Sequence, residues 1–167
     1  MCENQGVCYW AFRLDGGPDP EVLVGVDTAH NDQWLHCAEK FSTFVYCQIW
    51  DHRWPLTIGD GGIGVAAQEL GLATTDLQFL QANFLQRPST YGWPGKTNYR
   101  FQVQDGGILI WDGEERGADW FVSAKTPVSL SAILSRIWHC GNLAKTMYDT
   151  APEAVEVLRD LREARDR

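Results

Sequence analysis

Two His–Cys dipeptides, His36-Cys37 and His139-Cys140, contain the residue types that could bind a metal ion or form a nucleophile. Zinc accepts imidazole and thiolate ligands in proteins. On a strand, however, neighbouring side chains point to opposite faces, so His36 and Cys37 cannot easily reach one ion. No C-x-x-C or H-x3-H pair accompanies them. We therefore expect no metal site, and we interpret these cysteines as core residues next to surface histidines.

Nucleophilic catalysis would require a Cys or Ser beside a His and an orienting acid. Cys140 follows His139, and His52 follows Asp51, but neither pair has a recognised local context. A histidine at the end of a helix commonly interacts with the helix dipole instead. The residues thus identify no catalytic group, and a non-catalytic protein is the favoured interpretation.

A glycine-rich segment, Gly59-Asp60-Gly61-Gly62-Ile63-Gly64, matches the G-x-G-x-x-G pattern of dinucleotide-binding loops. In such a loop, backbone N–H groups and a helix N-terminus hold a pyrophosphate. Only Leu56-Thr57-Ile58 precedes the match, directly after Pro55, and no acidic residue ends a strand about 20 residues later. We therefore interpret the segment as a linker and expect no cofactor.

The chain has 167 residues, of which 44% are hydrophobic and 22% charged, as in a soluble globular protein. Its formal net charge of −8 argues against binding to nucleic acid, which requires clustered Lys and Arg. Met1 leads into Cys2-Glu3-Asn4 without an apolar run, and no segment is apolar over the length of a membrane span. The five cysteines are irregularly spaced. We expect a cytoplasmic protein with reduced thiols and no membrane partner.

Period-two patterns predict strands, and apolar residues at helical spacing predict helices. The strands are predicted at 5–14, 21–26, 33–38, 99–103, 108–111 and 118–124. Helices are predicted at 39–51, 65–70, from Thr74 or Thr75 to about 86, at 129–139, near 143–148 and at 152–164. Pro88 is expected to end the third of these helices, and 89–98 to form a loop.

Two parts of the chain show the same order of elements. The residues from Gly6 to Trp10 align with 107–111, and the Trp34 strand aligns with the Trp120 strand. Each copy continues into a helix that closes on Ile-Trp. We predict an α+β fold with an antiparallel sheet built from two similar strand–strand–helix units, helices on one face and a C-terminal helix. A single domain would span 1–167, with units at about 4–54 and 99–140, a helical linker at 55–98 and C-terminal helices at 141–167.

The same segments resemble the SMI1/KNR4 family, also called the SUKH superfamily. ENQGVCYWAFRL, DPEVLV and AEKFSTFVYCQIW resemble the second half of that domain, and YGWPGKTNYRFQV, ILIW and DWFVSA resemble the C-terminal region of longer actinobacterial members. Such domains usually have an N-terminal helical portion before the NQG strand, at which this sequence begins. We therefore expect either a truncated start or a diverged form in which the second unit completes the fold. The resemblance implies a non-catalytic α+β module, and many bacterial members are thought to be immunity proteins that neutralise a toxin.

Acidic residues gather in the predicted turns and have tryptophans near them, which could form an acidic, aromatic surface for a basic protein partner. The candidate partner-binding residues are Trp34, Trp93, Trp111, Asp112, Glu114, Glu115 and Asp119. Turns also favour Asp for local hydrogen bonds, and the eight tryptophans could fill the core. Two other functions stay open: a biosynthetic accessory protein or enzyme with a Trp- and Tyr-lined pocket between sheet and helices, and a regulatory scaffold like the eukaryotic family members.

Overall fold

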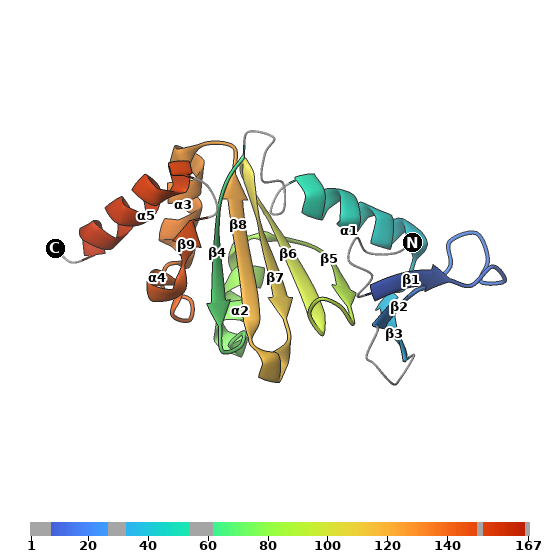
Figure 1. Ribbon diagram of the computed structural model, residues 1–167. Helices are drawn as coiled ribbons and strands as arrows, with labels where there is room; N and C mark the ends of the chain where they lie inside the picture. The colour runs from blue at the N-terminus through green and yellow to red at the C-terminus, as the bar shows by residue number, and fades with distance from the viewer. Residues whose placement is uncertain (1–7, 27–32, 54–61, 150–151, 166–167) are drawn as a thin grey trace.

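The computed structural model describes residues 8–26, 33–53, 62–149 and 152–165, and it combines helices with antiparallel strands (Figure 1). The strands of the described residues form two sheets, a three-stranded sheet of order β1-β2-β3 and a six-stranded sheet of order β5-β6-β7-β8-β4-β9. The predicted α+β class is therefore confirmed.

The small sheet and its helix come from the first third of the chain. Their elements are β1 (Cys8–Phe12), β2 (Val22–Val26), β3 (Trp34–Ala38) and α1 (Phe41–Arg53). Alternate residues of the strands face α1 and form a core that includes Val22, Val24 and Phe44. Asp19 fixes the start of α1, because its carboxylate accepts hydrogen bonds from the backbone N–H and the hydroxyl of Ser42. These bonds lower the pKa of the Asp19 carboxyl.

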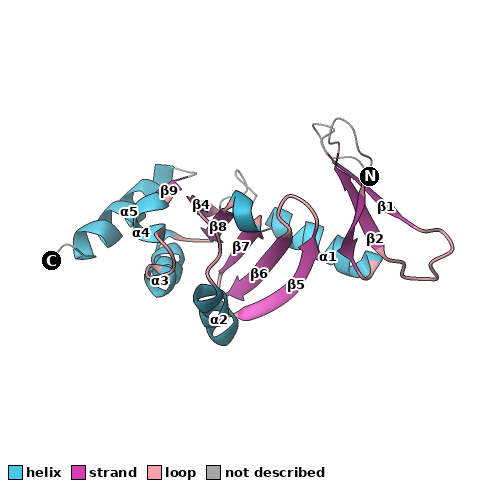
Figure 2. Cartoon of the chain, turned by 90° about the horizontal axis from the view of Figure 1, so that it is seen from below, coloured by secondary structure: helices cyan, strands magenta, loops and turns pink. Residues whose placement is uncertain are grey.

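The large sheet comes from the remaining chain. Its strands are β4 (Ile63–Glu69), β5 (Leu85–Tyr91), β6 (Thr97–Val103), β7 (Gly106–Asp112), β8 (Ala118–Ala124) and β9 (Tyr148–Asp149). Its other elements are α2 (Thr74–Asn83), η1 (Glu114–Arg116), α3 (Pro127–Ile137), α4 (Leu143–Thr146) and α5 (Pro152–Arg165). Figure 2 shows α2, α3 and α5 on one side of this sheet. On that side Trp120, Ile110 and Val65 pack against helix residues such as Leu134 and Leu158.

α1 lies on the opposite face of the large sheet, at its β5–β6 end. Tyr99 and Phe101 of β6 pack in the core beneath the other helices, so Arg100 and Gln102 point the other way. Both of these side chains bond to α1: Arg100 to Asp51, and Gln102 to the indole N–H of Trp50. The prediction that the helices lie on one face is wrong for α1.

The prediction of one shared sheet is also wrong. The strands of the first predicted unit form their own sheet, and the second unit joins a sheet with strands from the segment between the units. β3 lies beside the edge strand β5 without a ladder of hydrogen bonds. Instead, side chains of α1 and the β5–β6 hairpin join the two parts.

The helical linker predicted at 55–98 is wrong where the structure describes it. Of residues 65–70, expected as a helix, all but Leu70 belong to β4, whose seven residues all pair with β8. Ala and Gln have high intrinsic helix propensity, but propensity is only a weak determinant, and tertiary pairing overrides it here. Among the described residues of this segment, only α2 is helical as predicted, and it ends at Asn83.

Pro88 lies inside a strand rather than after a helix. β5 is an edge strand, and its register with β6 shifts between Arg87 and Thr90. A proline lacks the N–H that a ladder needs, so edge strands and irregularities are the places where a sheet accepts it. The predicted loop at 89–98 is therefore shorter, lying between Tyr91 and Thr97.

Candidate functional site

The half-buried aromatic pair Trp111 and Phe121 marks the candidate site. Trp111 is on β7 and Phe121 on β8, and their ring centroids lie 4.5 Å apart. Their strand neighbours Ile110, Trp120 and Val122 belong to the helix-covered core, so both rings face the other side of the sheet. A half-buried tryptophan beside another ring offers a large, rigid contact area.

Polar side chains flank this pair on the same face. Asp119 is directly opposite Trp111 across the β7–β8 ladder, and Gln68 of β4 is opposite Asp119. Asp119 is half-buried and Gln68 is exposed. The register thus places an indole, a carboxylate and an amide in one row across three strands. We call Trp111, Phe121, Asp119 and Gln68, with Asp112 and Glu114 at the strand end, the Trp111 surface.

The turn after β7 adds the other two carboxylates. The Asp112 carboxylate accepts a 3.1 Å hydrogen bond from the backbone N–H of Glu114, and this bond stabilises the turn. The exposed Glu114 carboxylate pairs with Lys96 at 2.6 Å and raises the pKa of that ammonium. Three acids thus gather at one end of the sheet, and Lys96 offsets only part of their charge.

The other predicted partner-binding residues lie elsewhere. Trp34 is on β3 of the small sheet, 47% exposed, with its indole over Gly25. Trp93 is half-buried against the core of the small sheet, with its ring 6.1 Å from that of Trp10. Glu115 is in η1, and its side chain lies outside the described part of the structure. The fold therefore brings together Trp111, Asp112, Glu114 and Asp119, but not the two other tryptophans.

Two members of the Trp111 surface were not among the predicted residues. Phe121 lies two residues after Asp119 in a strand, so the period-two pattern alone could have placed it on the same face. Gln68 offered no such signal, because its strand was predicted to be a helix.

The candidate catalytic groups are not arranged for nucleophilic chemistry. Burial raises the pKa of the Cys47 thiol to about 11 and that of Cys140 to about 12. His139 is exposed, and its ring packs edge-on against Phe79 at 4.5 Å. Asp51 is bound to Arg100 rather than to His52. Within the described ranges, no group of three His, Cys, Asp or Glu side chains could hold a metal ion.

The glycine-rich motif lies only partly within the described residues, since 59–61 are outside them. Its last residues, Ile63 and Gly64, begin β4, and the following segment continues as that strand. A dinucleotide site requires a helix N-terminus at this point. The local structure therefore lacks the helix on which the pyrophosphate interpretation depends.

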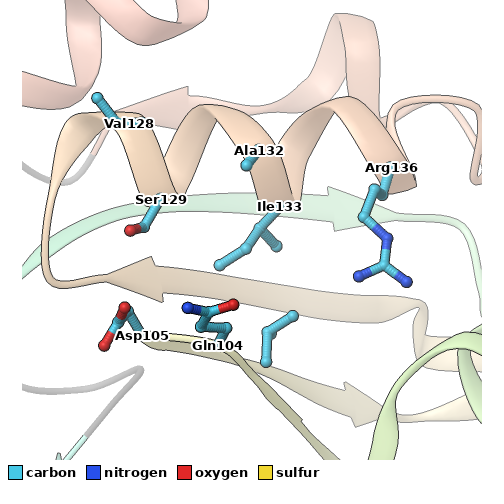
Figure 3. Close-up of a pocket in the computed structure, with 8 residues that line it drawn as sticks. Gln104, Asp105, Val128, Ser129, Ala132, Ile133 and Arg136 are labelled. Carbon is cyan, nitrogen blue, oxygen red and sulfur yellow. The ribbon is translucent and has the colours of Figure 1, made fainter.

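Two clefts open between the sheet and its helices. One, of about 470 Å³, has the buried Glu69 on its wall, where Glu69 accepts hydrogen bonds from the backbone N–H of Asn142 and the hydroxyl of Thr146. The other, of about 260 Å³, lies between α3 and the β6–β7 turn. In Figure 3, Ser129 and Ile133 point from α3 toward the side where Gln104 and Asp105 lie, and Arg136 is at the other end of the helix. Neither cleft has a Trp or Tyr in its lining.

No family model, curated protein or solved structure matches this chain. Among the described residues, none of the helices combines the length and the apolar character needed to cross a membrane.

Proposed function

We propose that this protein is a non-catalytic binding module that associates with a basic partner protein through the Trp111 surface. The observation that carries the proposal is the half-buried Trp111–Phe121 pair, with centroids 4.5 Å apart and with Asp119 opposite Trp111 on the same face. The carboxylates of Asp112 and Glu114 lie at the end of β7. Tryptophan is enriched among the residues that contribute most to protein–protein affinity.

Charge supports a basic partner. The chain has a formal net charge of −8, and an acidic surface attracts a cationic protein over distances of about a Debye length, roughly 8 Å at physiological salt. The exposed Glu114 and the half-buried Asp112 and Asp119 near an aromatic centre also match the usual anatomy of an interface, in which a polar rim surrounds an apolar core.

The state of the cysteines in the described part of the chain supports a role without catalysis. Cys37, Cys47 and Cys140 are buried free thiols, and burial raises the pKa of each. A thiol reacts as its thiolate, so these groups are unsuited to attack a substrate near neutral pH. A small-molecule function in a Trp- and Tyr-lined pocket draws no support from the two clefts described above, since neither has such a residue in its lining.

The kind of partner follows from the resemblance to SUKH immunity proteins, which makes a toxin the favoured candidate. Binding would be stoichiometric and would neutralise or sequester the partner. Free thiols suit a reducing compartment, which supports a cytoplasmic location for the encounter.

The test begins with retention of partners from a lysate of the source organism, at low and moderate salt, with identification by mass spectrometry. The affinity of a purified basic partner is then measured by calorimetry for the wild type and Trp111→Ala. We expect the variant to bind at least about 30-fold more weakly, the equivalent of the roughly 2 kcal/mol that defines a hot spot. Higher salt should weaken wild-type binding, because screening reduces the attraction.

Trp34→Ala is the matched control, since Trp34 is a partly exposed tryptophan on the other sheet. Circular dichroism and thermal unfolding verify that both variants are folded. Retention of no protein would overturn the binding function itself. Equal binding by Trp111→Ala and the wild type would overturn the assignment to the Trp111 surface.

A further inference from the structure

α1 is apolar on two opposite sides. From Phe41 to Trp50 its sequence has no charged residue. Its buried side consists of Phe44, Cys47, Trp50 and Asp51, which face the two sheets. A surface helix that covers a core on one side ordinarily has charged and polar residues on the other. The second apolar side of α1 therefore needs an explanation.

The second side is a continuous stripe. Phe41, Val45 and Ile49 are four residues apart and so lie along one line of the helix. Phe41 is 37% exposed and Ile49 63% exposed, and Val45 between them is half-buried, packed against the core of the small sheet. Phe12 of β1 extends the stripe, with its ring 5.0 Å from that of Phe41, and Tyr46 lies beside it, 39% exposed. We call these five residues the α1 stripe; α1 lies at the periphery, with the sheets on one side of it (Figure 1).

We propose that the α1 stripe binds the same stripe of a second copy of this chain, with the two α1 helices antiparallel. A twofold axis beside Val45 brings Phe41 of one copy against Ile49 of the other, because Val45 is midway between them. Such an interface is isologous: the same patch serves both copies and the contact closes at two chains. In this register the aromatic ring of Phe41 in each copy complements the branched side chain of Ile49 in the other copy.

The charges at the ends of α1 fit the antiparallel direction. The beginning of the helix has Asp19, Glu39 and Lys40, which leaves an excess of negative charge, and the last turn has His52 and Arg53. Antiparallel pairing places the acidic end of each helix near the basic end of the other. It also opposes the two helix dipoles, whereas parallel pairing would bring like ends together.

The expected association is weak. One helix pair with a neighbouring strand residue buries less than the roughly 1,200 Å² at the lower limit of standard interfaces. We therefore expect a dimer that forms in the micromolar range. The α1 stripe shares no residue with the Trp111 surface, so this contact does not depend on the proposed function.

The test is sedimentation velocity on the full chain from a few to several hundred micromolar. We expect the wild type to shift from monomer to dimer and Ile49→Glu to stay monomeric, because the change puts a carboxylate against Phe41 of the other copy. Val155→Glu is the matched control: Val155 is 47% exposed on α5, outside the stripe, and its variant should dimerise like the wild type. Circular dichroism establishes that the variants fold.

The register has its own readout. In a Cys2→Ser background, Val45→Cys should form a symmetric disulfide between two copies under mild oxidation, because the axis brings the two thiols together. Ile49→Cys should not, since residues 49 of the two copies lie roughly 12 Å apart along the helix axes, at about 1.5 Å per residue. The proposal is overturned if the wild type stays monomeric over the whole concentration range, or if Ile49→Glu dimerises with undiminished affinity. It is also overturned if Ile49→Cys forms the disulfide and Val45→Cys does not.

Discussion

Arg100 and Asp51 form a buried ion pair with two hydrogen bonds between α1 and β6. The Nε–Oδ1 and Nη2–Oδ2 distances are 2.7 and 2.6 Å, and the side chains are 2% and 9% exposed. Further donors of Arg100 bond to the Thr90 hydroxyl and the Asn98 carbonyl. Burial raises the pKa of the Asp51 carboxyl, while the bonds from Arg100 act in the opposite direction. The pair ties the helix of the small sheet to the large sheet.

Asp51→Asn should therefore lower the free energy of unfolding by about 3–5 kcal/mol, because it leaves the Arg100 charge buried without a counterion. Urea denaturation followed by tryptophan fluorescence measures the change. Lys96→Met is the control at an exposed pair and should cost less than about 1 kcal/mol. A loss of under about 1 kcal/mol for Asp51→Asn would contradict the structural role of the pair.

Gly117→Ala should destabilise the protein far more than Gly17→Ala. Both glycines have positive φ, +91° and +83°, so an alanine is strained at either position by about 1–3 kcal/mol. At Gly117 the added Cβ would also lie 2.5 Å from the Glu69 carbonyl oxygen, whereas nothing lies within 4 Å at Gly17. We expect Gly117→Ala to cost at least about 3 kcal/mol, since overpacking adds to the strain. Similar losses in thermal or urea unfolding for the two variants would argue against this backbone contact.

Ala73→Ser should stabilise the protein. Ala73 occupies the N-cap of α2 in an extended conformation and makes no side-chain hydrogen bond to the helix. A serine there can accept a bond from a free N–H of the first turn, worth about 0.5–2 kcal/mol. Thr126→Ala is the reverse experiment, because Thr126 already caps α3 through the N–H of Ser129, and it should lose a similar amount. If the urea midpoints of both variants shift in the same direction, the assignment of these two N-cap positions is refuted.

Cys47 and Cys140 should resist thiol reagents at pH 8 until the protein unfolds. Burial raises their pKa values to about 11 and about 12, against about 8.5 for a free cysteine, so little thiolate forms. Because the folded pKa values are the higher ones, the neutral thiols stabilise the fold fully below about pH 8.5. That contribution declines as the pH rises toward 11. Labelling with iodoacetamide, measured for each cysteine by mass spectrometry, checks this resistance to thiol reagents. The prediction is wrong if Cys47 of the native protein is labelled as fast as Cys47 of the denatured chain.

The local hydrophobic pattern of the sequence was sufficient to predict much of the secondary structure. The period-two residues of β2 and β8 and the apolar spacing of α1 predicted their type, because each element buries one face, and that face repeats along the chain. The same reasoning placed Asp112, Glu114 and Asp119 in or beside a hairpin with Trp111, since a short turn necessarily brings its ends together.

Long-range pairing decided the rest. Whether the strands of two similar units share a sheet depends on contacts between segments far apart in sequence, as do the strand identity of β4 and the place of Pro88 at an edge. The Arg100–Asp51 pair joins residues that are 49 positions apart, and nothing around either residue indicates its partner. The sequence by itself determined the α+β class and the residues of the hairpin. The tertiary structure alone decided which surfaces face solvent, because burial is a property of the assembled layers and not of any one segment.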